Sequence, residues 1–324
     1  MLGRTGRDVS VVGLGCWQLG ADWGQVDDAD ALAVLGAAVD AGVTFLDTAD
    51  VYGDGRSERL IARFRASRHA PLTVATKCGR RADPHVPSSF TPEHLRIWTD
   101  RSRANLGVDQ LDLVQLHCPP TPVFSSDEVF DALDELVADG NIAAYGVSVE
   151  TCDEALTAIA RPNVASVQII LNAFRRKPLE KVLPAAAAAG VGIIARVPLA
   201  SGLLSGKYDE HTTFAADDHR TYNRHGEAFD VGETFSGVPY EVGVVAAREL
   251  SAIAGELGIP TAALALRWVI DQPGVTTVIP GARNATQAAA NSAAAGVAPL
   301  SADVLKSIEQ IYDTHIRAHV HDRW

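Results

Sequence analysis

Four polar residues lie at or just beyond the ends of predicted strands, and their types could together carry out proton transfer. Asp47 ends the second predicted strand, Lys77 the third and His117 the fourth, and Tyr52 follows the second strand in the loop DTADVYGDG. Each has an ordinary interpretation by itself: a helix cap, a solvated rim residue, a packed aromatic and a core histidine. In a barrel, however, the ends of the strands meet at one face, so the four side chains are expected to come together.

As a set, these residues suit the reduction of a carbonyl group. A free tyrosine has a pKa near 10, too high for efficient proton donation at neutral pH. The ammonium group of Lys77 would stabilise the phenolate of Tyr52 and lower this pKa. Asp47 would pair with Lys77 and hold it in place, while His117 could hydrogen-bond the carbonyl oxygen of a substrate. The set therefore comprises a general acid, a residue that tunes it, an orienting carboxylate and an electrophilic helper.

Segments typical of strands and helices alternate along nearly the whole chain. The strands are continuous apolar runs such as LDLVQLH, typical of parallel strands covered on both faces. Strands are expected at 11–15, 44–47, 72–77, 112–117, 142–148, 164–171, 191–197 and 275–279. Helices are expected at 28–41, 57–66, 92–106, 126–138, 151–160, 179–189, 241–257, 261–271 and 285–295. Eight strands without an obvious linker predict a single (β/α)₈ TIM barrel domain over residues 1–324, with a doubly wound sheet as the alternative.

Two segments depart from this alternation. Residues 207–239, after the seventh strand, form a long predicted loop that mixes aromatic, histidine and charged residues. Beyond Pro299 a C-terminal extension contains a further predicted helix at 303–311. Long structureless insertions in compact domains are usually lids or mobile connectors. We expect both segments to border a substrate site at the barrel mouth.

Composition narrows the range of partners. The net charge of −12 argues against a general surface for nucleic acids or anionic membranes, because phosphate binding needs clustered Lys and Arg. The N-terminus is broken by glycine and charge too early for a signal peptide, and the apolar stretch Pro184–Ala195 is too short to span a bilayer. The four cysteines form no CxxC pair, and no metal site is expected. These features predict a cytoplasmic protein with free thiols that acts on a small molecule.

The sequence resembles the aldo-keto reductase superfamily over nearly its whole length. The stretches FLDTADVYGDGRSE, TKCG, LDLVQLH, YGVS, PLASGLLSGKY and VIPGARNATQAAAN match the motifs of that superfamily in order. The resemblance implies that Asp47, Tyr52, Lys77 and His117 are the catalytic tetrad, with Tyr52 as proton donor. It also implies an NADP-dependent alcohol oxidoreductase that uses NADPH/NADP⁺ without a Rossmann fold.

The resemblance further implies a set of cofactor-binding residues. Arg283 is expected at the 2′-phosphate, which favours NADPH over NADH, because a guanidinium suits phosphate geometry. The other candidates are Pro280, Gly281 and Ala282 near the adenosine phosphates; Gln287 and Asn291 at the adenine; Ser148 and Gln168 at the nicotinamide amide; Leu199, Ser201, Leu203 and Lys207 at the pyrophosphate; and Gly15, Cys16, Trp17, Asp47, Arg196 and Pro198 elsewhere in the site.

Two positions differ from the commonest pattern of the superfamily. Val149 stands where an asparagine usually follows the serine, so one contact to the nicotinamide amide is expected to be missing. Arg196 stands where an aromatic ring often stacks on the nicotinamide. A guanidinium can also stack, but we expect its fixed charge to disfavour the positively charged, oxidised ring.

The substrate pocket is less clearly specified. Trp17, Trp23, Trp98 and Phe124 lie in or near predicted loops and could form an apolar wall or simply pack the rim. The basic residues Arg80, Arg81 and His85 favour a polar or anionic substrate, although surface solvation explains them equally well.

Three functions remain open at this stage. The first is reversible reduction of an aldehyde or ketone, including sugar-like ones. The second is a regulatory protein that binds NADP(H) as a redox sensor with weak catalysis. The third is an unrelated barrel enzyme such as an isomerase or hydrolase, which would need a metal cluster or a carboxylate pair at the strand ends, and neither is evident in the sequence.

Overall fold

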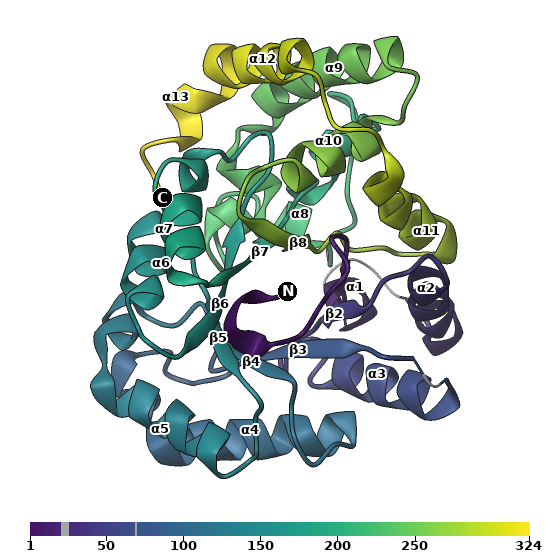
Figure 1. The fold of residues 1–324 in the computed structure, drawn as a ribbon. Coiled ribbons are helices and arrows are strands. Elements are labelled where there is room, and N and C mark those ends of the chain that lie inside the picture. Colours follow the sequence, from purple (N-terminus) through teal and green to yellow (C-terminus); the bar gives the residue numbers. More distant parts are fainter. Residues whose placement is uncertain (21–25, 69) are drawn as a thin grey trace.

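In the computed structural model, which describes residues 1–20, 26–68 and 70–324, eight parallel strands form one sheet in sequence order (Figure 1). The strands are β1 (Leu14–Gly15), β2 (Phe45–Asp47), β3 (Thr73–Cys78), β4 (Leu113–His117), β5 (Tyr145–Ser148), β6 (Val164–Ile170), β7 (Gly192–Arg196) and β8 (Val275–Val278). Parallel bridges from Val12 to Val278 and from Gly15 to Gly281 join the first strand to the last. The sheet closes into the predicted (β/α)₈ barrel, and the doubly wound alternative is wrong.

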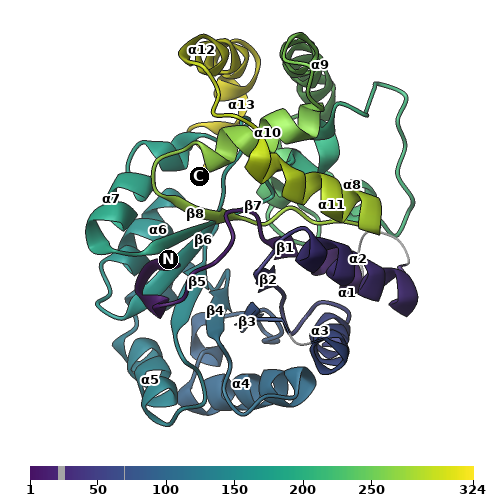
Figure 2. The same cartoon turned by 45° about the vertical axis from the view of Figure 1, so that its right-hand side comes forward.

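Helices surround the barrel on its outer side (Figures 1 and 2). The helices are α1 (Trp17–Gly20), α2 (Asp28–Asp40), α3 (Arg56–Ser67), α4 (Pro92–Leu106), α5 (Asp127–Ala138), α6 (Cys152–Ile159), α7 (Val182–Ala189), α8 (His219–Tyr222), α9 (Tyr240–Glu256), α10 (Thr261–Ile270), α11 (Ala285–Ala293), α12 (Ala302–Ile311) and α13 (Arg317–Val320). The longer predicted helices are confirmed to within a few residues at each end. Local signals are the reason: Thr91 caps α4 and Gly107 ends it in the left-handed region.

The N-terminal residues close one end of the barrel. Leu2 is fully buried in a small cluster inside the barrel with Phe45, Leu113 and Ile194, among others. In Figure 1 the N-terminus lies within the ring of strands. Arg4 holds this segment in place by donating hydrogen bonds to backbone carbonyls, including that of Ala189 at 2.6 Å. A cavity opens at the opposite end of the barrel.

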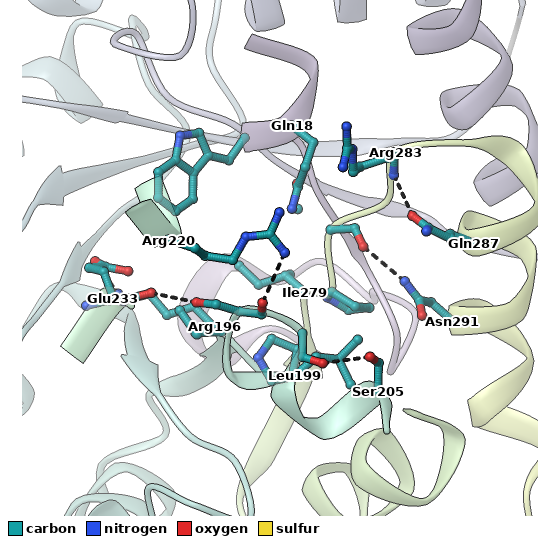
Figure 3. Close-up of a pocket in the computed structure, with 18 of the residues that line it drawn as sticks. Gln18, Arg196, Leu199, Ser205, Arg220, Glu233, Ile279, Arg283, Gln287 and Asn291 are labelled. Atoms are coloured by element: carbon teal, nitrogen blue, oxygen red, sulfur yellow. Dashed lines mark hydrogen bonds and ion pairs between the residues drawn. The ribbon is translucent and has the colours of Figure 1, made fainter. Parts of the chain in front are cut away.

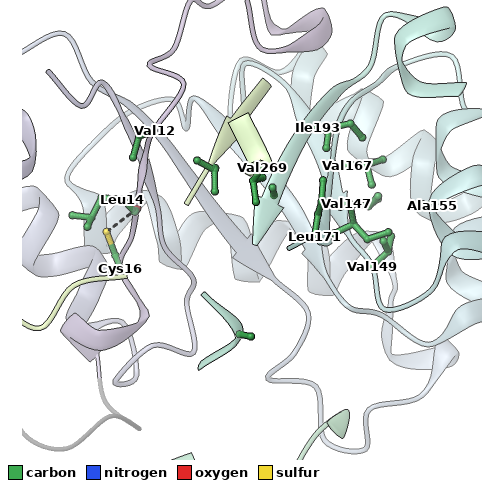
Figure 4. Packing of buried hydrophobic residues seen from close by; sticks show 14 of the residues in the cluster. Val12, Leu14, Cys16, Val147, Val149, Ala155, Val167, Leu171, Ile193 and Val269 are labelled. Carbon is green, nitrogen blue, oxygen red and sulfur yellow. Dashed lines mark hydrogen bonds between the residues drawn. The ribbon is translucent and has the colours of Figure 1, made fainter. Parts of the chain in front are cut away.

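The larger hydrophobic core lies between the strands and the helices. Outward-facing side chains of the strands, such as Val147, Val167 and Ile193, pack there against the helices (Figure 4). All four cysteines are buried free thiols, as predicted.

The segment after β7 is more ordered than predicted. It contains α8 and two 3-10 turns, Val231–Glu233 and Phe235–Gly237, rather than a structureless loop. Asn223 is fully buried, and its side-chain oxygen accepts hydrogen bonds from the backbone N–H groups of Ala228 and Phe229 at 2.8 and 2.9 Å. These interactions pair two backbone N–H groups of the loop within the segment itself.

The C-terminal extension is longer than the single helix predicted. After α12, a π-helical turn (Tyr312–Ile316) and α13 bring Trp324 onto the segment that follows β7. The indole ring lies 3.6 Å from the guanidinium of Arg175, and its N–H donates to Asp230 at 3.1 Å. Among the described residues, no single helix is both long and apolar enough to cross a membrane; only α9 and α10 together, bent by 91° at their junction, meet the criteria of length and composition.

Candidate active site

A cavity of about 710 Å³ opens at the carboxyl ends of the strands, within the size range typical of small-molecule sites. Figure 3 shows Arg196 and Glu233 on one side of it and Arg283, Gln287 and Asn291 on the other. The cavity is lined by most of the predicted site residues, namely Gly15, Trp17, Asp47, Tyr52, His117, Ser148, Gln168, Arg196, Pro198, Leu199, Ser201, Lys207, Pro280, Gly281, Arg283, Gln287 and Asn291.

The four residues of the predicted tetrad come together at the barrel end of this cavity. The Nζ atom of Lys77 lies 2.6 Å from Oδ2 of Asp47 and 3.3 Å from the hydroxyl oxygen of Tyr52. The rings of Tyr52 and His117 meet edge to face, 5.9 Å apart. Because Lys77 donates to the phenol oxygen, the hydroxyl proton of Tyr52 is not used in this contact.

The electrostatics of Tyr52 differ from the prediction. Burial raises the pKa of Tyr52 to about 12, and the opposing effect of Lys77 does not overcome it. The expected net lowering of this pKa is therefore wrong, because a phenolate loses its hydration in this site. The pKa of His117 is held well below its usual range, first by burial and then by the charges of Arg80 and Lys77. Tyr52 is thus a protonated phenol and His117 a neutral imidazole near pH 7.

Close backbone packing positions the loop that carries Tyr52. A Cβ atom on Gly20, the last residue of α1, would come within 2.5 Å of the carbonyl carbon of Tyr52. Gly53 has a φ of +59° and lies against the carbonyl of Gly20 in the same way. Trp17 stacks on Tyr52 at a ring separation of 6.1 Å. Two glycines and an aromatic ring therefore fix the direction of the Tyr52 side chain.

Asp47 is the centre of a buried hydrogen-bond network. Besides Lys77, it accepts hydrogen bonds from the side-chain amides of Gln168 at 2.7 Å and Gln115 at 3.2 Å. Gln168, predicted to hold the nicotinamide amide, thus directs its N–H toward Asp47. Ser148 lies 3.5 Å from the sulfur of Cys118. Gln115 was not predicted, although its place in LDLVQLH, two residues before His117, is a signal that could have identified it.

Arg196 does not present an uncompensated charge. It is buried and forms ion pairs with Glu233 and, at 3.1 Å, with Glu150. The two carboxylates raise the pKa of Arg196 against the opposing effect of burial. The expectation that its fixed charge disfavours an oxidised nicotinamide does not hold, because two carboxylates more than balance that single positive charge. The carboxylates of Glu150 and Glu233 and the sulfur of Cys118 lie within 4.8 Å of one another, but Arg196 contacts all three groups.

Sequence reasoning missed both of these carboxylates. Glu150 follows β5 directly after Ser148 and Val149, so the rule that strand ends face the site could have found it. Glu233 lies in the segment after β7, and only the tertiary structure brings it to Arg196.

At the far end of the cavity, the N-terminus of α11 carries the predicted adenosine-binding residues. Asn284 caps this helix, and the backbone N–H of Arg283 donates to the side chain of Gln287 at 2.9 Å. Asn291 donates to the carbonyl of Gly281 at 3.1 Å. Among the described residues, no carboxylate pairs with the exposed guanidinium of Arg283. This end therefore offers a cation and backbone donors to an anion.

Three predicted cofactor residues, Cys16, Leu203 and Ala282, do not reach the cavity wall; each is at most 2% exposed and packs in the core.

The aromatic residues that could form a wall or pack the rim lie in different places. Trp17 lines the cavity, but Phe124 is in the core and Trp98 stacks on His94 away from it. Trp23 lies outside the described residues. The other wall aromatics, Tyr208, Phe214 and Phe229, come instead from the segment after β7.

Comparisons with known proteins agree with this fold. The sequence model of the Aldo/keto reductase family matches residues 11–313. The aldo-keto reductase YhdN of Bacillus subtilis is 30% identical over 96% of this chain and 92% of its own length. A solved glycerol dehydrogenase of Gluconobacter oxydans is 29% identical, with a TM-score of 0.78 over 98% of this chain and 94% of that one.

A solved aldo-keto reductase of Klebsiella pneumoniae in complex with NADPH is 24% identical, with a TM-score of 0.71 over 96% of both chains, a likeness of fold. NADP(H), the cofactor expected from the resemblance, is thus the cofactor in a solved structure of the same fold. The family match spans every strand from β1 to β8, and the resemblance expected from the motifs is confirmed. The chain belongs to the aldo/keto reductase family of oxidoreductases.

Proposed function

We propose that this protein reduces an aldehyde or ketone to an alcohol with NADPH, reversibly, and that Tyr52 is the general acid. The observation that carries the proposal is the contact of Lys77 with both Asp47 and the hydroxyl of Tyr52, at 2.6 and 3.3 Å, beside a neutral His117. A protonated phenol and a neutral imidazole are the two hydrogen-bond donors that a carbonyl oxygen needs as it gains negative charge.

The cavity suits an elongated dinucleotide cofactor. Lys207 is an exposed cation of its wall, and its far end has a second one, Arg283; neither has an ion-pair partner among the described residues. That end also has the N-terminus of α11. These groups fit phosphates. We infer that Arg283 binds the 2′-phosphate, that Gln287 and Asn291 lie at the adenine, and that Ser148 and Gln168 lie near the nicotinamide. When bound, NADPH supplies the hydride that adds to the carbonyl carbon.

The residues of this chain then act on the oxygen. The phenol of Tyr52 and the imidazole of His117 hold the carbonyl oxygen, and the O–H bond of Tyr52 breaks as its proton moves to that oxygen. Lys77 stabilises the phenolate left behind, and Asp47 keeps the ammonium of Lys77 in position. In the reverse direction, the Tyr52 phenolate accepts the proton of the alcohol.

The decrease in NADPH absorbance with a panel of aldehydes, ketones and keto-sugars tests the proposal. The Tyr52→Phe variant should lower turnover by about 10²–10⁴-fold, the usual range for a positioned acid. NADPH binding should change little, because Phe retains the ring that packs on Trp17. A Phe variant with near-normal turnover would remove Tyr52 from the mechanism. Tight NADPH binding without turnover on any carbonyl would favour the regulatory alternative.

A further inference from the structure

Arg80 is a cation of the cavity that the proposed reaction does not use. It follows β3 two residues after Cys78, and its guanidinium lies 5.6 Å from the ring of Phe229. Gly79 before it has a φ of +98°, and a Cβ there would come within 2.5 Å of the ring of Phe90. The chain therefore turns at a position that only glycine accommodates, and this turn directs Arg80 to the cavity.

The guanidinium of Arg80 differs from its neighbours because it forms no ion pair with a described residue. Arg196 has Glu150 and Glu233, Arg220 has Asp218, and Arg81 pairs with Asp54. Among residues 1–20, 26–68 and 70–324, no carboxylate lies within 4.0 Å of Arg80. Burial lowers the pKa of Arg80, but nearby groups, including the more distant carboxylates of Glu233 and Glu150, raise it above its ordinary value. The guanidinium is therefore charged but lacks a carboxylate of the described residues in direct contact, and a ligand anion would fill that place.

Arg80 is also close to the reacting end of the cavity. Its charge is the largest electrostatic contribution that lowers the pKa of His117, second only to burial. Arg283, by contrast, lies beside the N-terminus of α11, where we infer the cofactor phosphates. An anion at Arg80 would therefore belong to the substrate.

We propose that Arg80 binds a carboxylate carried by the carbonyl substrate, so that the protein prefers oxo acids or carboxy-substituted aldehydes over neutral carbonyl compounds. A planar guanidinium and a carboxylate form paired hydrogen bonds. The ring of Phe229 beneath Arg80 provides an apolar surface for the body of the substrate. This assignment rests on the proposed function and names its substrate class.

Steady-state reduction of 4-formylbenzoate and of its neutral methyl ester tests the assignment, because the two aldehydes differ in charge at one position. The wild-type protein should have the higher kcat/KM for 4-formylbenzoate. Arg80→Gln should lower kcat/KM for 4-formylbenzoate by about 10–100-fold, mainly through KM, and leave the ester within about twofold. Arg80→Lys should restore part of the loss.

The matched control is Arg81→Gln, which removes a neighbouring charge that is already paired with Asp54. This variant should leave kcat/KM unchanged for both aldehydes. Equal losses for both aldehydes in Arg80→Gln would mean that Arg80 only supports the loop, and no loss would mean that it points elsewhere. The protein could instead prefer glyceraldehyde 3-phosphate over glyceraldehyde and show no preference for 4-formylbenzoate over its ester. That result would overturn the proposal that Arg80 binds a carboxylate, and would indicate a phosphate instead.

Failure of the proposed function can be told apart from failure of this assignment. If the protein reduces neutral aldehydes but shows no preference for 4-formylbenzoate over its ester, the proposed function stands and the assignment of Arg80 is wrong. If no carbonyl is reduced, calorimetric titration of the NADP⁺-loaded protein with benzoate and benzamide decides instead. Benzoate should bind more tightly than benzamide, and Arg80→Gln should abolish the difference; equal binding of both would overturn the assignment.

Discussion

At the scale of single residues, partners decide what a charged side chain does. Arg196 has a guanidinium that suits stacking, but Glu150 and Glu233 neutralise it. Arg80 lines the same cavity, but no carboxylate of the described residues lies within 4.0 Å of it. The same residue type thus has two different consequences, and only contacts between distant segments distinguish them.

Removing one of the two carboxylates should make the surroundings of Arg196 less negative. The resemblance places an oxidised or reduced nicotinamide near this residue, and only the oxidised ring is positive. Glu233→Gln should therefore weaken NADP⁺ relative to NADPH by about fivefold, on the order of 1 kcal/mol after screening. Fluorescence titration of both cofactors measures the ratio. Glu227→Gln, in the same segment but exposed, is the control, and a ratio that Glu233→Gln leaves unchanged would place Arg196 away from the nicotinamide.

Arg283 should select between the two dinucleotides. A charge-assisted contact with a 2′-phosphate contributes about 1.5–3 kcal/mol, or roughly 10–150-fold in affinity. Arg283→Ala should weaken the binding of NADPH by about that factor and leave the binding of NADH nearly unchanged. Equal weakening of both in a binding titration would assign Arg283 to the fold or to the pyrophosphate instead.

At the scale of elements, the segment after β7 is held from two sides. On one side, the hydroxyl of Ser201, in the turn directly after β7, donates to the carbonyl of Glu233 at 3.0 Å and accepts from the backbone N–H of Phe235 at 3.1 Å. From the C-terminus, Trp324 packs on Gly237, where a Cβ would come within 2.3 Å of the indole ring. Contacts on two sides therefore fix the segment that supplies Glu233 and three aromatic residues of the cavity wall.

Trp324→Ala should release one side of this segment. Truncating a buried tryptophan costs about 3–5 kcal/mol, and most of that loss should appear as local opening near residues 228–237. Hydrogen exchange in this segment should become faster, and NADPH should bind more weakly. Trp98→Ala, a tryptophan away from the segment, is the control. Unchanged exchange at 228–237 would show that the Ser201 contacts alone are sufficient.

At the scale of the whole molecule, one buried carboxyl group should affect stability. Asp50 is fully buried in the loop that carries Tyr52, and no side chain donates a hydrogen bond to it within the described residues. Burial, and then the charge of Glu58, raise its pKa from 3.8 to about 7, while Arg81 and Arg101 act in the opposite direction. The folded protein therefore holds this proton at pH values where the unfolded chain has lost it.

The sign of the effect follows from this difference in protonation. Between about pH 4 and pH 7 the folded state binds more protons than the unfolded state, so Asp50 makes the free energy of unfolding fall as pH rises through this window, by up to about 4 kcal/mol. Asp50→Asn removes the ionisation. The variant should gain stability relative to the wild type between pH 5 and pH 8, measured by thermal unfolding. Asp54→Asn, at an exposed position, should show no such gain, and parallel pH profiles for Asp50→Asn and wild type would contradict the account.

The sequence by itself determined the order of strands and helices, and it predicted the four residues of the proposed tetrad, which the structure brings together. Strand patterns and helix caps are local signals, so the bounds of α4 were predictable from Thr91, Pro92 and Gly107. The tetrad was predictable because a closed barrel brings strand ends to one face. These features depend on near neighbours along the chain or on one simple rule of topology.

Only the tertiary structure decided the electrostatics and the walls of the site. Burial, rather than Lys77, determines the direction in which the pKa of Tyr52 is shifted. The partner Glu233 and the wall ring of Phe229 come from a segment whose order depends on Asn223 and on Trp324. Desolvation and ion pairing depend on which distant segments exclude water from a side chain, and no local pattern of residues records this.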